Sequence, residues 1–151
     1  IMKIVVIGAS HGNIANLKLV LGFAKKIKAG VIVHCGDWDN LKAVKLVYSY
    51  KIPVYGVLGN ADIDTEIAKI VNGQWLRVNL GGRDVGIIHN LTISHQPFII
   101  GCDIVFCGHR HFKSERIVDG VKVISPGALH SVKPSFAVYE TNTNRVEFFD
   151  L

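Results

Sequence analysis

Five short apolar segments of this 151-residue sequence are each followed by residues that can bind a metal ion. These segments run into GASHGN, HCGDWDN, LGNAD, IIHN and CGHRH. Imidazole nitrogen, carboxylate oxygen and amide oxygen together suit borderline divalent ions such as Mn, Fe, Co, Ni or Zn. The pattern therefore predicts a metal centre, and its candidate ligands are His11, Asp37, Asn60, His89, His109 and His111.

The number of candidate ligands bears on the number of ions. Six candidate ligands are more than one tetrahedral ion binds, but they suit two ions that share a carboxylate. Asp37 is the strand-end carboxylate directly after a glycine, so we expect it to bridge the two ions. His109 and His111 stand two apart on a segment expected to be extended, which would point both to one side and let them serve the ions separately. The alternative for any single segment is an ordinary turn, because Gly-Asn and Gly-Asp are common in turns.

The elements that must position these residues follow from the apolar pattern. Apolar runs alternate with helical periodicity in the first half, which predicts a parallel sheet covered by helices. Ligands of such sheets bind at the carboxyl ends of the strands, so we expect the candidates to converge on one edge. Gly30 is expected to close the first helix. The expected strands are 4–7, 31–35 and 54–58, and the expected helices are 14–27, 40–50 and 65–71.

The second half changes character and contains little helical pattern. Hairpins are expected where GGR, DG and TNTN separate short apolar runs. We expect this half to be mostly antiparallel, and we expect one domain over residues 1–151 with two packed sheets and helices outside. The runs in question are 75–80, 84–88, 104–107, 116–118, 121–125, 135–140 and 146–149.

Composition narrows the classes of partner. The chain is 49% hydrophobic and 19% charged, typical of a compact globular protein, and no run is long enough to span a membrane. The net charge of +5 comes from lysines scattered over predicted helices, without a nucleic-acid motif, so nucleic acid is not an expected partner. Three cysteines without repeated spacing, and no export signal, predict reduced, buried thiols and a cytoplasmic protein.

The motifs together resemble those of a known family. ASH (9–11), GD (36–37), GN (59–60), IIHN (87–90) and GHRH (108–111) resemble the motifs of the calcineurin-like metallophosphoesterase superfamily. The chain is most similar to its small, single-domain bacterial and archaeal phosphodiesterases, which are related to the scaffold subunit of retromer. SPGA (125–128) and PSFAVYE (134–140) are similar to the family's closing strands. The resemblance implies an α/β fold, a four-layer α/β/β/α sandwich of two mixed sheets flanked by helices.

The resemblance also implies how the ligands are shared. His11, Asp37 and His111 would hold the first ion, and Asp37, Asn60, His89 and His109 the second. A metal-bound hydroxide would attack the phosphorus of a small phosphodiester, or of a phosphomonoester. Manganese is one of the expected ions, together with Ni, Fe, Co and Zn, and no membrane partner is implied.

Three positions depart from the family pattern. Ala9 stands where the family has its first aspartate ligand, Leu91 replaces a further histidine, and Ala61 follows Asn60 where larger members have a catalytic histidine. Asn60 and Asp62 are the candidate catalytic residues, and helix capping is the alternative for Asp62, as for the neighbouring Asp64. Because of Ala9, the alternative function is a catalytically weak or inactive protein that serves as a binding or scaffold module.

Three aromatic side chains near the motifs have two interpretations each. We expect His34 to be a core histidine with satisfied hydrogen bonds, because it lies inside a predicted strand. His95 is expected on a surface loop, although it could reach the metal edge. Trp38 could line the approach of the substrate or could pack in the core.

Overall fold

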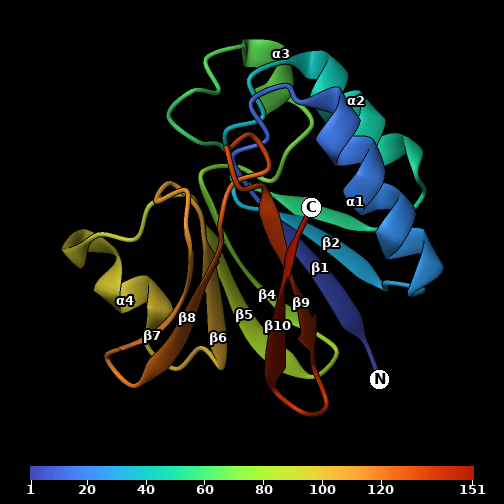
Figure 1. The fold of residues 1–151 in the computed structure, drawn as a ribbon. Coiled ribbons are helices and arrows are strands. Elements are labelled where there is room, and N and C mark those ends of the chain that lie inside the picture. Colours follow the sequence, from blue (N-terminus) through green and yellow to red (C-terminus); the bar gives the residue numbers. More distant parts are fainter.

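A computed structural model describes all residues, 1–151, as two mixed five-stranded sheets packed face to face, with helices outside (Figure 1). The predicted α/β sandwich is confirmed. The strands are β1 (Lys3–Ile7), β2 (Val31–His34), β3 (Val54–Gly56), β4 (Trp75–Leu80), β5 (Arg83–Ile88), β6 (Ile104–Cys107), β7 (Lys113–Val118), β8 (Val121–Pro126), β9 (Ser135–Glu140) and β10 (Arg145–Asp150). The first sheet has the order β10-β9-β1-β2-β3, and the second has the order β4-β5-β6-β8-β7.

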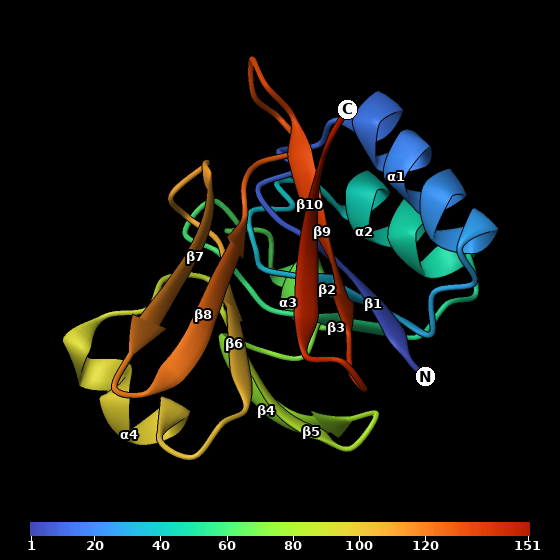
Figure 2. The same cartoon turned by 60° about the horizontal axis from the view of Figure 1, so that its bottom comes forward.

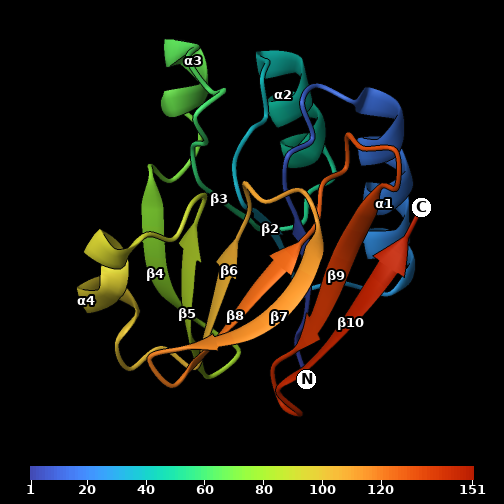
Figure 3. The same ribbon diagram turned by 60° about the vertical axis from the view of Figure 1, so that its left-hand side comes forward.

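Helices cover the outer faces of both sheets. α1 (Ile14–Lys26) and α2 (Leu41–Ser49) pack on the first sheet (Figure 2), and α3 (Thr65–Ala68) follows β3. A 3-10 turn (Ile93–His95) and α4 (Gln96–Ile99) lie on the second sheet, far from α1 (Figure 3). None of these helices combines the length and the apolar character that crossing a bilayer requires.

Three apolar clusters fill the spaces between the layers. Val5 and Ile7 of β1 face α1 and α2, whereas Ile4 and Val6 face the second sheet. Alternate side chains of a strand point to opposite faces, so both faces of β1 are buried and its sequence is continuously apolar. The third cluster lies between the second sheet and α4, and includes Val105.

Three parallel strands in each sheet fix where the site forms. β1, β2 and β3 are parallel, and so are β5, β6 and β8. The second half is mostly antiparallel, as expected, because β4–β5, β7–β8 and β9–β10 are antiparallel pairs. Its two parallel pairs, β5–β6 and β6–β8, arise where the 93–99 segment and the β7 hairpin act as crossovers. The short helices of the first crossover have too few residues to show a helical period.

Element boundaries differ from the expectation in a few places. β2 and β3 end one and two residues early, and α3 stops at Ala68 rather than at residue 71. Lys28, with φ 55°, makes the left-handed turn that closes α1, where Gly30 was expected to do so. All three cysteines are buried and unpaired, as expected, and burial raises the pKa of the Cys35 thiol.

Candidate metal centre

The loops that follow β1, β2, β3, β5 and β6 meet at one edge of the sandwich, and they bring the six predicted ligands into two neighbouring groups. The first group contains His11, Asp37 and His111, whose ligand atoms all lie within 4.8 Å of one another. The second contains Asn60, His89 and His109, with Asp37 at its border.

His11 presents an unpaired nitrogen to the first group. Its Nδ1 lies 3.0 Å from Oδ1 of Asp39, so the ring donates its Nδ1 proton to that carboxylate. The Nε2 atom is buried, has no hydrogen-bond partner, and lies 3.7 Å from Oδ2 of Asp37. A buried lone pair without a partner costs about 1–3 kcal/mol, which a bound cation would offset.

His89 is the centre of the second group. Its Nδ1 lies 2.8 Å from the carbonyl oxygen of Cys35, which can only accept, so the Nδ1 proton is donated there. The lone pair on Nε2 then faces Oδ1 of Asn60 at 2.9 Å, Nδ1 of His109 at 3.2 Å and Oδ2 of Asp37 at 3.4 Å. Two imidazoles, an amide oxygen and a carboxylate gathered in this way match the ligand chemistry of a borderline divalent ion.

Asp37 lies between the two groups. The same oxygen, Oδ2, is 3.7 Å from Nε2 of His11 and 3.4 Å from Nε2 of His89. Its other oxygen accepts a hydrogen bond from the Ala61 backbone N–H at 3.0 Å, and the residue is only 2% exposed. This position suits a carboxylate that bridges two ions.

Asp62 ties together the loops that carry Asp37 and Asn60. Its oxygens accept hydrogen bonds from four backbone N–H groups at 2.7–2.9 Å, those of Asp37, Trp38, Asp39 and Gly59. Helix capping is therefore wrong for Asp62, whereas Asp64 does cap α3 by accepting from the Glu66 N–H.

The site is built from strained backbone. Six residues other than glycine have left-handed φ values here, namely Ala9 (45°), His11 (41°), Asp37 (62°), Asp39 (70°), His109 (68°) and His111 (60°). Such a conformation costs about 1–2 kcal/mol per residue, and it clusters at functional sites. The expectation of an extended segment at 109–111 is thus wrong, although the two histidines do reach different groups. Gly59 is required because a Cβ there would collide with the Asp37 carboxylate.

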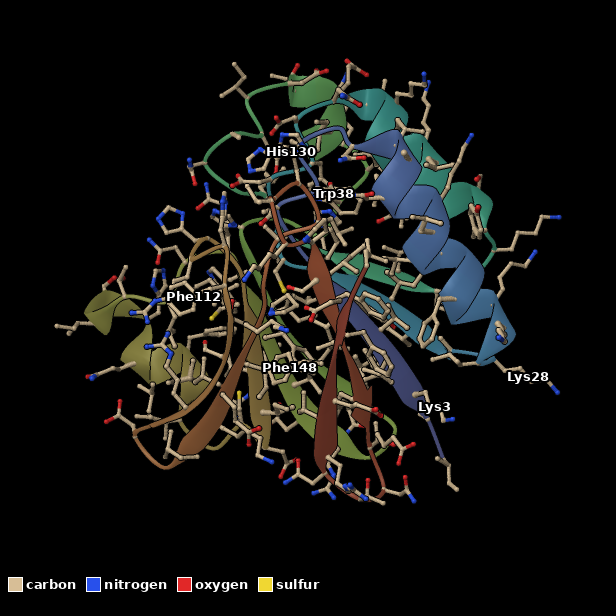
Figure 4. The ribbon with its side chains drawn as sticks, in the orientation of Figure 1. Lys3, Lys28, Trp38, Phe112, His130 and Phe148 are labelled. Carbon is tan, nitrogen blue, oxygen red and sulfur yellow. The ribbon has the colours of Figure 1, made fainter.

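His34 and Trp38 form a buried layer next to the site. His34 donates from Nε2 to Oγ of Ser10 at 2.9 Å, and its Nδ1 accepts from the Gly36 N–H at 3.1 Å. Burial, followed by the nearby His89 and His11, lowers the pKa of His34 to about 3. The prediction of a satisfied core histidine is confirmed. Trp38 stacks on His34 with ring centroids 3.6 Å apart and is fully buried, so it packs and does not line an approach (Figure 4).

The structure adds two residues that the sequence did not suggest. Asp39 contacts His11, and the GDWD spacing was the available signal for it. His130 is exposed at the same end of the sheets (Figure 4), with its ring centroid 6.1 Å from that of His11. No local pattern predicts this, because the segment is brought to the site by the His130 N–H, which donates to the Ala9 carbonyl at 3.1 Å.

The pKa of His111 is also shifted by its surroundings. Burial lowers its pKa, the neighbouring His11 lowers it further, and the negative charge of Asp37 opposes these effects. A lowered pKa keeps the imidazole neutral, which is the form that binds a metal ion.

Comparison with known proteins supplies the family. A profile for the calcineurin-like phosphoesterase superfamily domain matches residues 2–144. The chain belongs to this superfamily. Within the superfamily, it is 25% identical over 138 residues to phosphodiesterase MJ0936 of Methanocaldococcus jannaschii, an alignment that covers 83% of each chain.

Two solved structures show the same fold. The structure of a novel archaeal phosphodiesterase has a TM-score of 0.87 and 23% identity, covering 99% of this chain and 100% of that one. Wild-type Vps29 from Entamoeba histolytica, complexed with Zn²⁺, has a TM-score of 0.72 and 16% identity, with 99% of each chain covered. The predicted family resemblance is confirmed.

Proposed function

We propose that this chain is a metal-dependent phosphodiesterase that holds two divalent ions at the edge described above. The observation that carries the proposal is the environment of His89. Its Nδ1 proton is donated to the Cys35 carbonyl. The Nε2 lone pair faces three further atoms that can bind a metal ion, all within 3.4 Å. The His89 lone pair and the oxygens of Asn60 and Asp37 beside it are ligand types that a divalent cation would satisfy together.

The residues divide into two ligand sets. His11, Asp37 and His111 would hold the first ion, and the second would be held by Asp37, Asn60, His89 and His109. When bound, two such ions generate a nucleophile from water at neutral pH and neutralise charge that develops on the phosphoryl oxygens. Mn, Ni, Fe, Co and Zn all suit these ligands.

The chain's own contribution is to fix these ligands before any ion binds. The Cys35 carbonyl and the Asp39 carboxylate each accept an Nδ1 proton, so His89 and His11 present Nε2 to the site. Asp62 holds the backbone of Asp37, and the Ala61 N–H orients the Asp37 carboxylate. Ligands held in this way lose little conformational freedom on binding.

The comparisons support this proposal at the level of the family. A curated relative and a solved neighbour are both described as phosphodiesterases, and Vps29 of the same fold is complexed with Zn²⁺. We take a small phosphodiester as the substrate, with phosphomonoesters as weaker substrates.

The test is hydrolysis of bis(p-nitrophenyl) phosphate by protein loaded with Mn²⁺, together with metal analysis of the same sample. We expect Asp37→Asn and His109→Ala to abolish hydrolysis and to lower the metal content. Asp119→Asn is the matched control, because Asp119 also has a left-handed φ, of 49°, but lies in the exposed β7–β8 turn. Full turnover by the Asp37 and His109 variants would contradict the assignment.

A second candidate function rests on Ala9. The Ala9 side chain is 1% exposed and offers no ligand, so the first set has one carboxylate only. A weakly held first ion would leave a catalytically poor protein that acts as a binding or scaffold module. About one ion per chain and no turnover would favour this function, and Ala9→Asp should then raise metal occupancy above that of Ala9→Asn, which adds no charge.

A further inference from the structure

A cavity of about 310 Å³ opens beside the second ligand set. Besides Asn60 and His89 of that set, its walls include Gln74, Trp75, Asn90 and His95. We propose that this cavity binds the nucleobase-bearing arm of a nucleotide phosphodiester whose phosphate lies at the metal centre. The inference rests on the proposed function and names its substrate class.

Trp75 provides an aromatic platform at the cavity. It is 53% exposed although it begins β4, which is unusual for so large an apolar side chain. Phe98 contacts its ring with centroids 4.5 Å apart and planes inclined by 56°, so the indole is held in place while much of it remains accessible. Exposed aromatic rings of this kind stack on nucleobases.

Polar groups around the indole can read the edge of a base. The side-chain amides of Gln74 and Asn90 are exposed and make no hydrogen bond within the chain. Each amide offers both a donor and an acceptor, as the edges of bases require.

His95 adds a donor with a defined tautomer. Its Nδ1 accepts from the Thr92 backbone N–H at 3.2 Å and lies 2.8 Å from Oγ1 of Thr92, so the ring proton is on Nε2. The Nε2–H group has no partner in the chain and is free for a ligand. His95 is thus placed on a surface segment, as expected, but that segment also forms a wall next to the metal ligands.

The residues that line this cavity favour a ligand group that carries no charge. None of the residues around this cavity is a lysine or an arginine, and the carboxylate of Asp62 is already engaged by backbone N–H groups. A second cavity, beside His111, contains Lys113 and Lys133 and would suit an anionic group instead. An uncharged aromatic base therefore fits the Trp75 cavity better than a further phosphate does.

Tryptophan fluorescence tests the inference directly. The chain has two tryptophans, and because Trp38 is fully buried, only Trp75 can contact a ligand. We expect AMP to quench the fluorescence of zinc-loaded protein in a saturable manner and ribose 5-phosphate, which lacks a base, to leave it unchanged. Calorimetry should give AMP at least a ~10-fold higher affinity than ribose 5-phosphate, within the range that stacking on one aromatic ring provides.

Substitutions of Trp75 distinguish the loss of the aromatic platform from a general effect on folding. Trp75→Ala should reduce AMP affinity to that of ribose 5-phosphate, and Trp75→Phe should keep part of it. Phe112→Ala is the matched control, because Phe112 is a 55% exposed aromatic residue beside the other cavity. Equal affinity for AMP and ribose 5-phosphate in the unmodified protein would overturn the inference. Absence of diester hydrolysis with base-dependent AMP binding intact would instead overturn the proposed function.

Discussion

Asp39 and His11 form a carboxylate–imidazole pair, with Oδ1 of Asp39 3.0 Å from Nδ1 of His11. The pair joins the loop after β1 to the loop after β2, and both residues have left-handed φ values, 70° and 41°. The carboxylate determines which nitrogen of His11 carries the proton, and therefore that Nε2 is the nitrogen presented to Asp37. Asp39 thus brings a negative charge close to the first ligand set, where Ala9 supplies none.

Asp39→Asn should selectively weaken binding of the first ion. The amide keeps the left-handed backbone but removes the charge that holds the His11 tautomer, and loss of such a partner costs about 10–100-fold in metal affinity. Titration calorimetry with Zn²⁺ should show one class of site weakened and the other unchanged. Asp119→Asn again serves as the control, and equal weakening of both sites would contradict a specific effect on His11.

Asp62→Ala should cost more stability than its neighbour Asp64→Ala. Asp62 accepts four backbone hydrogen bonds, whereas Asp64 accepts one at the start of α3. Leaving several buried donors unpaired should lower the free energy of unfolding by about 3 kcal/mol, against about 1 kcal/mol for a lost helix cap. Urea denaturation in the presence of EDTA measures the free energy of unfolding of both variants. Similar decreases for the two would contradict a role of Asp62 in holding the loops together.

Acid should destabilise the metal-free protein through His34. Folded His34 has a pKa of about 3, because burial and then the nearby His89 and His11 disfavour its charged form, whereas the unfolded chain titrates near 6.5. Between these values the unfolded state binds more protons, so stability is fully present above pH 6.5 and falls as the pH drops toward 3. The slope contributed by one such group is about 1.4 kcal/mol per pH unit.

The variant His34→Gln isolates that contribution. It should be less stable at neutral pH, because the stacking on Trp38 is lost, but its stability should fall less steeply below pH 6.5. Urea unfolding with EDTA across this pH window gives both slopes. The exposed His130, changed to Gln, should leave the wild-type slope in place, and a wild-type slope in the His34 variant would refute the prediction.

The sequence predicts the ligand-bearing ends of the strands because each strand is buried on both faces. Continuous apolar runs such as that of β1 mark the strands, and the polar residue that ends each run marks the edge of the sheet. The grouping of His11 with Asp37 then follows from the parallel arrangement of β1 and β2, whereas His111 follows a strand of the other sheet and joins them through the packing of the two sheets.

The features that the sequence pattern does not predict depend on contacts between residues that are far apart in the chain. The parallel order β5-β6-β8 depends on which strand β7 pairs with, and no local period encodes this. The approach of His130 depends on a contact with Ala9, 121 positions earlier in the chain. The left-handed backbone at His109 and His111 is not predicted either, because histidine, although enriched in this conformation, adopts it in only a small minority of positions.

The candidate ligands come from both sheets. His11, Asp37 and Asn60 follow strands of the first sheet, whereas His89, His109 and His111 follow strands of the second. An ion held by Asp37 and His89 would therefore act as a clasp across the open end of the sandwich, in addition to any part it takes in chemistry. Because binding to the folded state alone raises stability, removing the ions should lower the Tm and loosen the sheets first at this end.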